Sequence, residues 1–600
     1  MANQPDFLLK KRAGVLVPLF SIYSKNSFGI GDFSDLRLAI DWVKEIGCSV
    51  LQLLPMNEMG PVSCPYDALS SFALEPVYIS LLDLPIPKDK SIKRQIEALR
   101  KSLSSQKEYC DYSVKKEKLR ILRQIFLMQK EDTPIGLLRF KEENAYWLPD
   151  FSLFKAIKDN FNGLAWYDWP EEFKERKSDS LLSFRKAHLE EIEFEEWVQW
   201  QLYEQFKITK NYAKGKKVLL KGDLPILVSK DSSDVWAHQE FFKLDFAAGA
   251  PPDMYCAKGQ RWGMPTYNWD KIQAVGYEYL KEKLKYAGNF YDLLRIDHVV
   301  GLFRIWSIPF NDPLENKGLN GFFDPKDESA WGDHGRKILK VMLESSDMFL
   351  CAEDLGVIPK VCIDTLKELG IPGNDVQRWA KDWNVRHDFL GKEEYRFLSV
   401  AMLSTHDTTN WAAWWENEAG TVDEDLFRRK CSDHRAVGFE RVKDQLFDQN
   451  LSSNGRLRWK SGINSLDKFL HIVSEQGRIP REHLSDFVDL WENSFNEKEK
   501  LWKILELDGK IRERCDTDIM KAVLNFILRS NSLLCINNIF DLLYLGGILK
   551  QPSYKYRINF PGLVDVKNWS LLSPIALEDL LNHKVNRLIK DMVLHSKRAS

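Results

Sequence analysis

The chain has 600 residues, of which 44% are hydrophobic and 29% are charged, so it can bury a core and is not a disordered protein. Its formal net charge is −2 and both signs are spread along the chain, which argues against nucleic acid or an anionic membrane as the main partner. No run of 18 or more apolar residues occurs, so a membrane span is not expected. A neutral substrate fits this balance.

The nine cysteines are scattered, without CxxC pairs or Cys/His clusters. This pattern predicts reduced core thiols and neither a disulfide framework nor a zinc site. The basic residues 10–12 and the apolar stretch after them resemble a signal peptide, but Pro18 interrupts the stretch and no small-residue cleavage site follows. We therefore expect a cytoplasmic protein. No carboxylate cluster has calcium-loop spacing, and no metal or organic cofactor is expected.

The first predicted elements are a strand over residues 14–20, a helix, and a second strand over residues 50–55. Asp32 or Ser34 can cap the helix, and Gly47 ends it. Apolar positions recur on the helix with helical spacing, at Leu36, Ala39, Ile40, Val43 and Ile46. A strand–helix–strand opening predicts a parallel sheet.

Two long segments interrupt this pattern. Residues 57–215 contain charged stretches of helical period and are interpreted as a helical insertion subdomain after the second strand. The third strand follows at residues 217–223. Residues 416–530 form a second, largely polar helical block near the seventh and eighth strands, which is either a surface insertion or an interaction module.

The later strands end at polar residues. The fourth is expected to end at Asp297, the fifth at Glu353 and the seventh near Asp407, with a weak sixth near residues 371–379 and the eighth at 532–538. The chain, residues 1–600, is therefore predicted to be a single catalytic domain of the α/β class, a (β/α)8 TIM barrel with helical insertions.

Three of these ends bear acids behind short apolar runs, at Asp297, Glu353 and Asp407. A charge at the end of a buried strand is costly unless it is used or paired. The acids could be salt-bridged rim residues, but three together with Arg295 and His298 favour a catalytic site, because such residues gather at the carboxyl ends of barrel strands.

The residue types indicate retaining glycosidic chemistry, which needs two carboxyl groups about 5–5.5 Å apart. Arg295 lies two residues before Asp297, on the same face of the strand, so we expect it to hold Asp297 ionised as a nucleophile. Glu353 has apolar neighbours that would raise its pKa, which suits an acid/base. Asp407, His406 and His298 can hydrogen-bond sugar hydroxyls.

Motifs along residues 14 to 590 resemble glycoside hydrolase family 77, the amylomaltases and disproportionating enzymes. Cys64-Pro-Tyr66 and Ser70-Ser71-Phe-Ala73 resemble the first substrate loop of that family, which implies substrate contacts for Tyr66 and Ser71. Gly249–Tyr255, which includes Asp253, and Gly259–Gly263, which includes Gln260 and Trp262, resemble its mobile loop over the acceptor sites. The resemblance implies Asp297 as nucleophile, Glu353 as acid/base and Asp407 as transition-state stabiliser.

One branch is resembled more than the others. Met264-Pro-Thr-Tyr-Asn-Trp269 is similar to the plant cytosolic disproportionating enzymes and their bacterial relatives. The first strand begins about 14 residues after Met1, so the starch-binding modules of the plant enzymes are expected to be absent. The polar run Asn374-Asp-Val-Gln-Arg-Trp379 departs from the more apolar sixth strand of ordinary members.

The residues alone indicate a retaining glycosidase on a barrel. The family resemblance implies a retaining 4-α-glucanotransferase that acts on malto-oligosaccharides and glycogen- or starch-like α-glucans, and passes a glucosyl or glucanyl unit to the 4-hydroxyl of an acceptor. Two alternatives stay open. Water could be the main acceptor, which would make the protein an α-glucan hydrolase, or the chain could be a catalytically idle glucan-binding protein.

Overall fold

The computed structural model describes residues 10–85, 90–103, 107–130, 133–252, 258–433, 437–474 and 479–599. At its centre, eight strands pair in parallel in the order β10-β13-β17-β1-β2-β3-β6-β9. The backbone N–H of Ala352, at the end of β9, donates to the Pro372 carbonyl beside β10 at 2.7 Å, so the two edge strands meet and the sheet curls into a barrel. The predicted (β/α)8 TIM barrel is confirmed.

Each predicted barrel strand is present, and most are shorter than the apolar run that announced them. In chain order they are β1 (Arg12–Leu16), β2 (Val50–Gln52), β3 (Leu219–Leu224), β6 (Leu293–Ile296), β9 (Phe349–Ala352), β10 (Gly373–Val376), β13 (Ser399–Met402) and β17 (Leu534–Asn538). The first strand stops before Pro18, which has no N–H to donate to a neighbouring strand, and residues Leu19–Ser21 form a turn of 3-10 helix.

The first barrel helix, α1 (Phe33–Glu45), is capped at its N-terminus by Asp32 and not by Ser34. Asp32 accepts the N–H of Ser34 at 2.8 Å, while Asp35 accepts the N–H of Asp32 at 2.9 Å, which forms a capping box. Gly47 follows the helix with a φ of +78°, a conformation that favours glycine. The predicted apolar face is buried.

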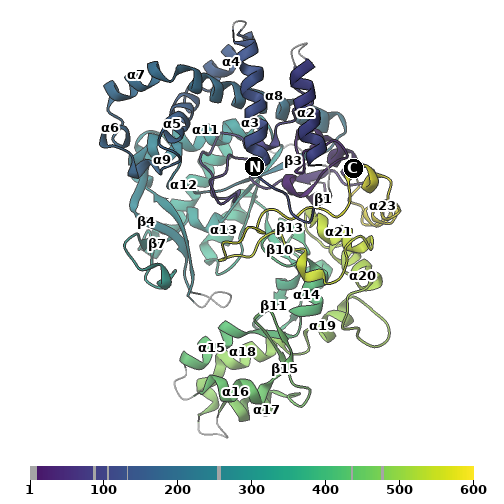
Figure 1. The fold of residues 1–600 in the computed structure, drawn as a ribbon. Coiled ribbons are helices and arrows are strands. Elements are labelled where there is room, and N and C mark those ends of the chain that lie inside the picture. The colour runs from purple at the N-terminus through teal and green to yellow at the C-terminus, as the bar shows by residue number, and fades with distance from the viewer. Residues whose placement is uncertain are drawn as a thin grey trace.

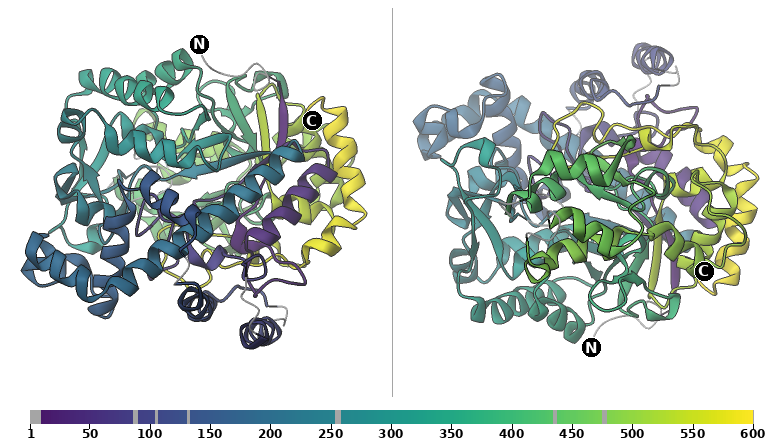
Figure 2. Two further views of the ribbon diagram at one scale, coloured as in Figure 1. Left: turned by 90° about the horizontal axis from the view of Figure 1, so that it is seen from above. Right: turned by 90° about the horizontal axis from the view of Figure 1, so that it is seen from below.

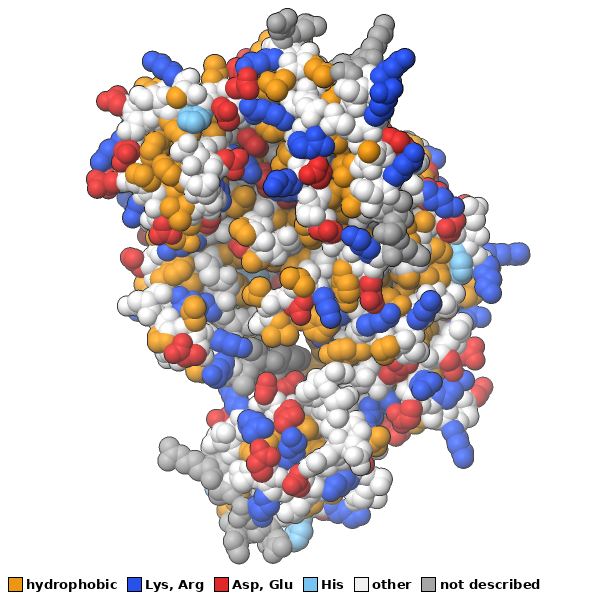
Figure 3. All heavy atoms as spheres, viewed as in Figure 1, with side chains coloured by type: hydrophobic (Ala, Val, Ile, Leu, Met, Phe, Trp, Pro, Cys, Tyr) orange, Lys and Arg blue, Asp and Glu red, His pale blue; other side chains and the backbone are white. Residues whose placement is uncertain are grey.

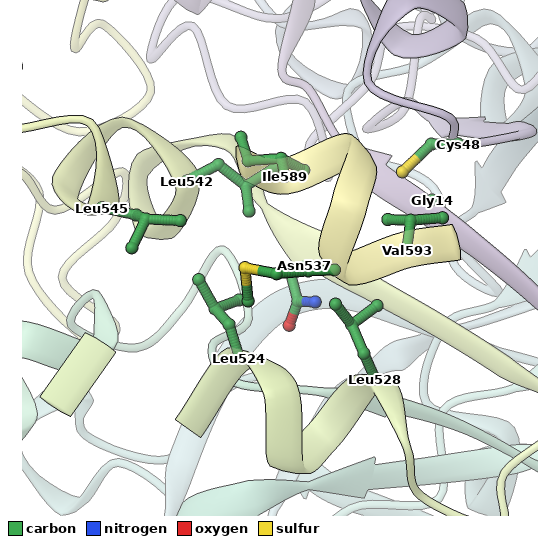
Figure 4. Close-up of a pocket in the computed structure, with 10 residues that line it drawn as sticks. Gly14, Cys48, Leu524, Leu528, Asn537, Leu542, Leu545, Ile589 and Val593 are labelled. Carbon is green, nitrogen blue, oxygen red and sulfur yellow. The ribbon is translucent and has the colours of Figure 1, made fainter. Parts of the chain in front are cut away.

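Other helices surround the barrel (Figures 1 and 2). They include α11 (Glu278–Ala287), α12 (Trp331–Glu344), α13 (Lys360–Leu369), α20 (Thr517–Leu528), α21 (Ile539–Leu545), α22 (Leu577–Leu581) and α23 (Val585–His595). Helices α20, α21 and α23 leave a small apolar pocket against the barrel wall (Figure 4). Gly14 lies in this pocket, and the pocket lining contains none of the three acids. It is a gap in the packing beside the barrel.

Seven helices lie between β2 and β3: α2 (Lys90–Ser102), α3 (Val114–Gln129), α4 (Ile135–Glu143), α5 (Leu148–Asn160), α6 (Glu171–Lys174), α7 (Ser178–Ala187) and α8 (Leu189–Gly215). Helix α8 packs against α1 of the barrel as well as α5. The buried carboxylate of Glu58 pairs with Lys115 at 3.1 Å and Lys155 at 2.8 Å. These ion pairs connect α3 and α5 to the loop that follows β2.

A second group of elements projects below the barrel in Figure 1. It lies between β13 and β17 and contains α14 (Trp411–Asn417), α15 (Glu424–Asp433), α16 (Phe439–Leu446), α17 (Leu466–Val473), α18 (Ser485–Ser494) and α19 (Glu497–Ile504). Buried residues from Val422 to Trp491 form a hydrophobic core separate from that of the barrel, and we call the part of the chain between these two residues the lobe. Figure 3 shows a hollow between the lobe and the barrel.

Two antiparallel sheets of three or more strands in the described ranges were not foreseen. The lobe has three short strands, β14 (Thr421–Asp423), β15 (Phe447–Ser453) and β16 (Arg456–Trp459), among its helices. Beside the barrel mouth, β4 (Phe242–Ala250), β5 (Gln260–Tyr267), β7 (Ile305–Pro309) and β8 (Phe322–Asp324) pair in the order β5-β4-β7-β8. Polar residues dominate β15, and Gly249 and Pro265 interrupt β4 and β5, so a regular apolar alternation is missing.

None of the helices in the described ranges has both the length and the apolar character that crossing a bilayer requires.

Candidate active site

The three acids lie at the carboxyl ends of their strands. Asp297 directly follows β6, Glu353 directly follows β9, and Asp407 lies in the loop after β13. Because all eight strands are parallel, these ends share one rim of the barrel. The rim forms the floor of the candidate site.

Arg295 on β6 connects the acids. Its guanidinium lies 2.8 Å from Asp297 Oδ1 and 4.0 Å from Glu353 Oε2. It also donates to both carboxylate oxygens of Asp223, at 2.7 and 2.8 Å. Asp223 ends β3, the strand beside β6, and is 4% exposed. One buried cation therefore serves three carboxylates.

The shared cation does not fully offset burial at Asp297. The pKa of Asp297 is raised to about 6, because burial raises it most, Arg295 lowers it, and the carboxylates of Asp223 and Glu353 raise it. Arg295 thus favours the ionised form of Asp297, as expected, although the pKa lies above its usual range. Asp297 is still mostly ionised at pH 7.

Glu353 is 9% exposed, and burial raises its pKa, as expected for a proton donor. Arg295 and two backbone donors limit this rise. Its Oε2 accepts the N–H of His298 at 2.8 Å, and its Oε1 accepts the N–H of Leu355 at 2.8 Å. These bonds fix the carboxyl group next to the Asp297 loop. The adjacent Asp354 faces away and pairs with Arg396 at 2.6 Å.

His298 has a left-handed backbone, with a φ of 45°, which is uncommon for a residue other than glycine. Burial lowers its pKa to about 4, so the imidazole is neutral at pH 7 and can both donate and accept a hydrogen bond. The ring of Trp262 meets it edge to face at 4.8 Å, and Trp262 Nε1 donates to Gln260 Oε1 at 2.9 Å. Residues Gln260 and Trp262, on β5, thus reach the rim.

Asp407 is paired with His406, whose Nε2 lies 3.3 Å from Asp407 Oδ2. Burial alone would raise the pKa of Asp407, but His406 and Asn559 hold it below its usual range. Burial would likewise lower the pKa of His406, yet Asp407 raises it. Asn559 Nδ2 donates to Asp407 Oδ1 at 2.7 Å.

An aromatic wall stands beside these acids. Tyr66 stacks on His406 with ring centroids 5.1 Å apart and donates its hydroxyl hydrogen to Asp223 at 2.7 Å. The ring of Trp569 lies 5.6 Å from Tyr66 and 5.8 Å from His406. A flat, partly polar wall of this kind suits the apolar face and hydroxyl edge of a sugar.

Two predicted substrate residues are not among those that the structure brings to the rim: Ser71 lies in another cluster, and Asp253 is not described. Ser71 belongs to a neighbouring cluster, where its N–H donates to both oxygens of Asp234 at 3.1 Å and its hydroxyl lies 3.1 Å from that of Tyr279. Asp253 falls outside the described residues. The structure brings the other predicted residues, including Tyr66, Gln260 and Trp262, to the rim or its wall.

Sequence reasoning missed Asn559 and Trp569 as members of the site. Asp223 ends a predicted strand, as the other acids do, and from the sequence it is equally well a substrate contact or a hydrogen-bonding support for a barrel residue. The segment with Asn559 and Trp569 has no strand or helical period that would mark it. Within the described ranges no group of three or more His, Cys, Asp or Glu side chains could hold a metal ion.

The arrangement can perform acid–base and nucleophilic chemistry at one carbon. It offers an ionised carboxylate at Asp297, a buried carboxyl at Glu353 and hydrogen-bonding groups around both.

The chain is similar to known proteins of one family. The family model of glycoside hydrolase family 77, described as 4-alpha-glucanotransferase, matches residues 17–575. The 4-alpha-glucanotransferase of Chlamydia trachomatis is 36% identical over 604 residues, which covers 98% of this chain and 96% of that protein. The 4-alpha-glucanotransferase DPE2 of rice is 28% identical over 557 residues, covering 68% of this chain and 58% of that protein.

Among solved structures, an amylomaltase from Streptococcus agalactiae superposes with a TM-score of 0.72. It is 23% identical and covers 98% of this chain and 100% of that chain, which supports the fold.

Proposed function

The chain belongs to the 4-alpha-glucanotransferases of glycoside hydrolase family 77, and from that premise we propose that Asp297, Glu353 and Asp407 carry out a two-step transfer with retention. In the first step Asp297 attacks the anomeric carbon of an α-1,4-linked glucose unit. The bond from that carbon to the leaving glucan breaks, and the leaving oxygen takes the proton of Glu353.

In the second step the acceptor takes the place of the leaving glucan. Its 4-hydroxyl gives a proton to Glu353 and its oxygen attacks the anomeric carbon, which releases Asp297 as a carboxylate. Asp407 and neutral His298 hydrogen-bond the hydroxyls of the reacting sugar, and those bonds tighten as the ring distorts.

The substrates that fit are malto-oligosaccharides and longer α-glucans. Their neutral hydroxyls match the hydrogen-bonding groups of the rim, and the rings of Tyr66, Trp569 and Trp262 suit their apolar faces. Transfer exceeds hydrolysis if the segment that includes Gln260 and Trp262 places the acceptor over the anomeric carbon and excludes water.

One observation gives the proposal its main support: Arg295 lies within 4.0 Å of carboxylate oxygens of both Asp297 and Glu353. A single buried guanidinium that reaches both acids supports a short separation between them, which a retaining mechanism requires.

Two further proposals follow. We propose that residues 57–215 and 416–530 are insertion subdomains of one catalytic domain, since each returns the chain to the next strand of the barrel. We also propose a cytoplasmic location, which the eight free cysteines of the described ranges support.

The test of the activity is an incubation of the purified protein with maltotriose, followed by separation of the products over time. A ladder of oligosaccharides longer than maltotriose, with glucose accumulating, is the expected result. Glucose and maltose without longer products would contradict the proposed transferase and would indicate a hydrolase. An unchanged substrate, with maltose plus glycogen also unchanged, would favour an idle glucan-binding protein.

A further inference from the structure

A buried arginine that follows the neighbouring strand β10 supports the loop that contains His406 and Asp407. Arg378 follows β10 in a turn of 3-10 helix and is 3% exposed. Its guanidinium donates to Ser404 Oγ at 3.1 Å, to Thr409 Oγ1 at 3.0 Å and to the Thr409 carbonyl at 2.7 Å. These acceptors flank His406 and Asp407, so one side chain holds both ends of the loop.

Two neighbours of Arg378, Asp541 and Gln377, hold Trp411, the first residue of α14. Asp541 of α21 accepts the backbone N–H of Trp411 at 2.7 Å and the Ser404 hydroxyl at 3.3 Å. Gln377 Oε1 accepts the indole N–H of Trp411 at 2.7 Å. The polar end of the sixth strand, which departs from the apolar pattern of ordinary family members, is therefore used in contacts with this loop.

The burial of Arg378 is not explained by a gain in the stability of the fold. Burial lowers its pKa to about 10, and its approach to the Glu418 carboxylate, at 3.9 Å, is long for an ion pair. A buried ion pair often stabilises a protein no more than apolar side chains of similar volume would. The hydrogen bonds to the loop are the contacts that only a guanidinium, with its several donors in one plane, can make together.

We propose that Arg378 is a positioning residue for Asp407. By fixing the distance between Ser404 and Thr409, it holds Asp407 and His406 in the one orientation that meets the reacting sugar. Arg378 acts through the loop, because the Asp407 carboxylate itself contacts His406 and Asn559. This inference rests on the role proposed above for Asp407.

The test compares three variants for kcat and KM on maltotriose and for melting temperature. Arg378→Met removes all donors with little change in length. Arg378→Lys keeps one donor group that can reach the Thr409 carbonyl. Arg598→Met is the matched control, since Arg598 is 0% exposed and donates to the carbonyls of Leu528, Ser530 and Ser532 at 2.6, 2.8 and 2.6 Å, at the opposite end of the barrel.

Arg378→Met is expected to lower kcat at least about tenfold, the loss that follows when about 1.4 kcal/mol of transition-state stabilisation is removed, with KM changed much less. Arg378→Lys should recover part of kcat. Arg598→Met should lower the melting temperature and leave kcat per folded molecule unchanged. A normal kcat in Arg378→Met, or a loss no larger than that of Arg598→Met, would overturn the proposal.

Two further variants keep the test decisive. If Arg378→Met does not fold, Thr409→Val removes one acceptor of the guanidinium with almost no change in shape, and a lowered kcat at constant KM is again expected. Asp407→Asn, measured in parallel, separates the two proposals. Full turnover in Asp407→Asn would overturn the function proposed for that acid, whereas an inactive Asp407→Asn beside a normal Arg378→Met would overturn only the positioning role.

Discussion

The acids after β6 and β9 take their partners from the ends of those two neighbouring strands, whereas Asp407, beside its neighbour His406, also depends on segments far away along the chain. Arg295 lies two residues from Asp297, and the N–H of Leu355 lies two residues from Glu353. Asp407, by contrast, depends on Asn559, and its loop depends on Arg378 and Asp541. Contacts between residues two apart can be predicted from a sequence motif. Contacts between distant segments form only when the whole barrel has folded.

The largest effect is expected at the proposed proton donor, on the locally held side. Glu353→Gln keeps only one of the two backbone hydrogen bonds, because its amide nitrogen cannot accept an N–H, and it removes the acidic proton, so turnover of maltotriose should fall by about 10²- to 10⁴-fold. A maltosyl fluoride donor needs no proton for departure of its leaving group. Its cleavage rate should stay within about tenfold of the wild-type rate if acid catalysis is what is lost. Equal losses on the two donors would contradict the assignment.

The next effect concerns the cation that the rim acids share. Arg295→Met leaves Asp223, Asp297 and Glu353 without their common partner, so the free energy of unfolding should fall by roughly 3–5 kcal/mol. Turnover should fall as well, because the pKa of Asp297 would rise further. Urea unfolding and initial rates measure the two effects. A variant as stable as the wild type would show that Asp223 is not buried against Arg295.

A smaller effect is expected from the distant side of the comparison. Asn559→Ala removes one hydrogen bond to Asp407, and kcat should fall roughly three- to tenfold, as for the loss of about one hydrogen bond. Asn568→Ala is the matched control, since Asn568 donates to the Phe560 and Leu563 carbonyls in the same segment without contacting Asp407. If the two variants lose kcat equally, the segment as a whole matters and the Asn559 contact does not.

The smallest effect is a shift in pH dependence. Asp297 must be deprotonated to attack, so kcat/KM should fall as pH drops below about 6, the pKa of Asp297. Asp223→Asn removes a charge that raises this pKa and frees Arg295, so the acid limb should move to lower pH. Asp292→Asn, at the other end of β6, should leave the limb in place. A limb that moves to higher pH in Asp223→Asn would contradict this account of the shared cation.

The same contrast explains how far the sequence could predict the molecule. The strands and the three acids were predicted because most of the strands are short apolar runs, and because Asp297 and Glu353 directly follow such runs, whereas the polar sixth strand gave only a weak signal. The pairing of Arg295 with Asp223 was missed, since 72 residues separate them and only strand order makes them neighbours. Asn559 approaches Asp407 across 152 residues of chain, and no periodicity marks its segment.

The antiparallel sheets were missed for a different reason. Strands β4 and β5 contain glycine and proline at positions where the register shifts, so they lack the alternation by which a strand is recognised. The raised pKa of Asp297 was not foreseen, because its largest cause is burial in the folded barrel mouth, which the sequence does not display.

The most direct test of the central claim is to trap the covalent intermediate on the Glu353→Gln variant. Maltosyl fluoride should load Asp297, and the altered acid/base should slow the release of the sugar. Intact-mass measurement followed by peptide mapping should show one added maltosyl unit on the peptide that contains Asp297. An adduct on any other residue, or transfer with inversion and no adduct at all, would contradict the account.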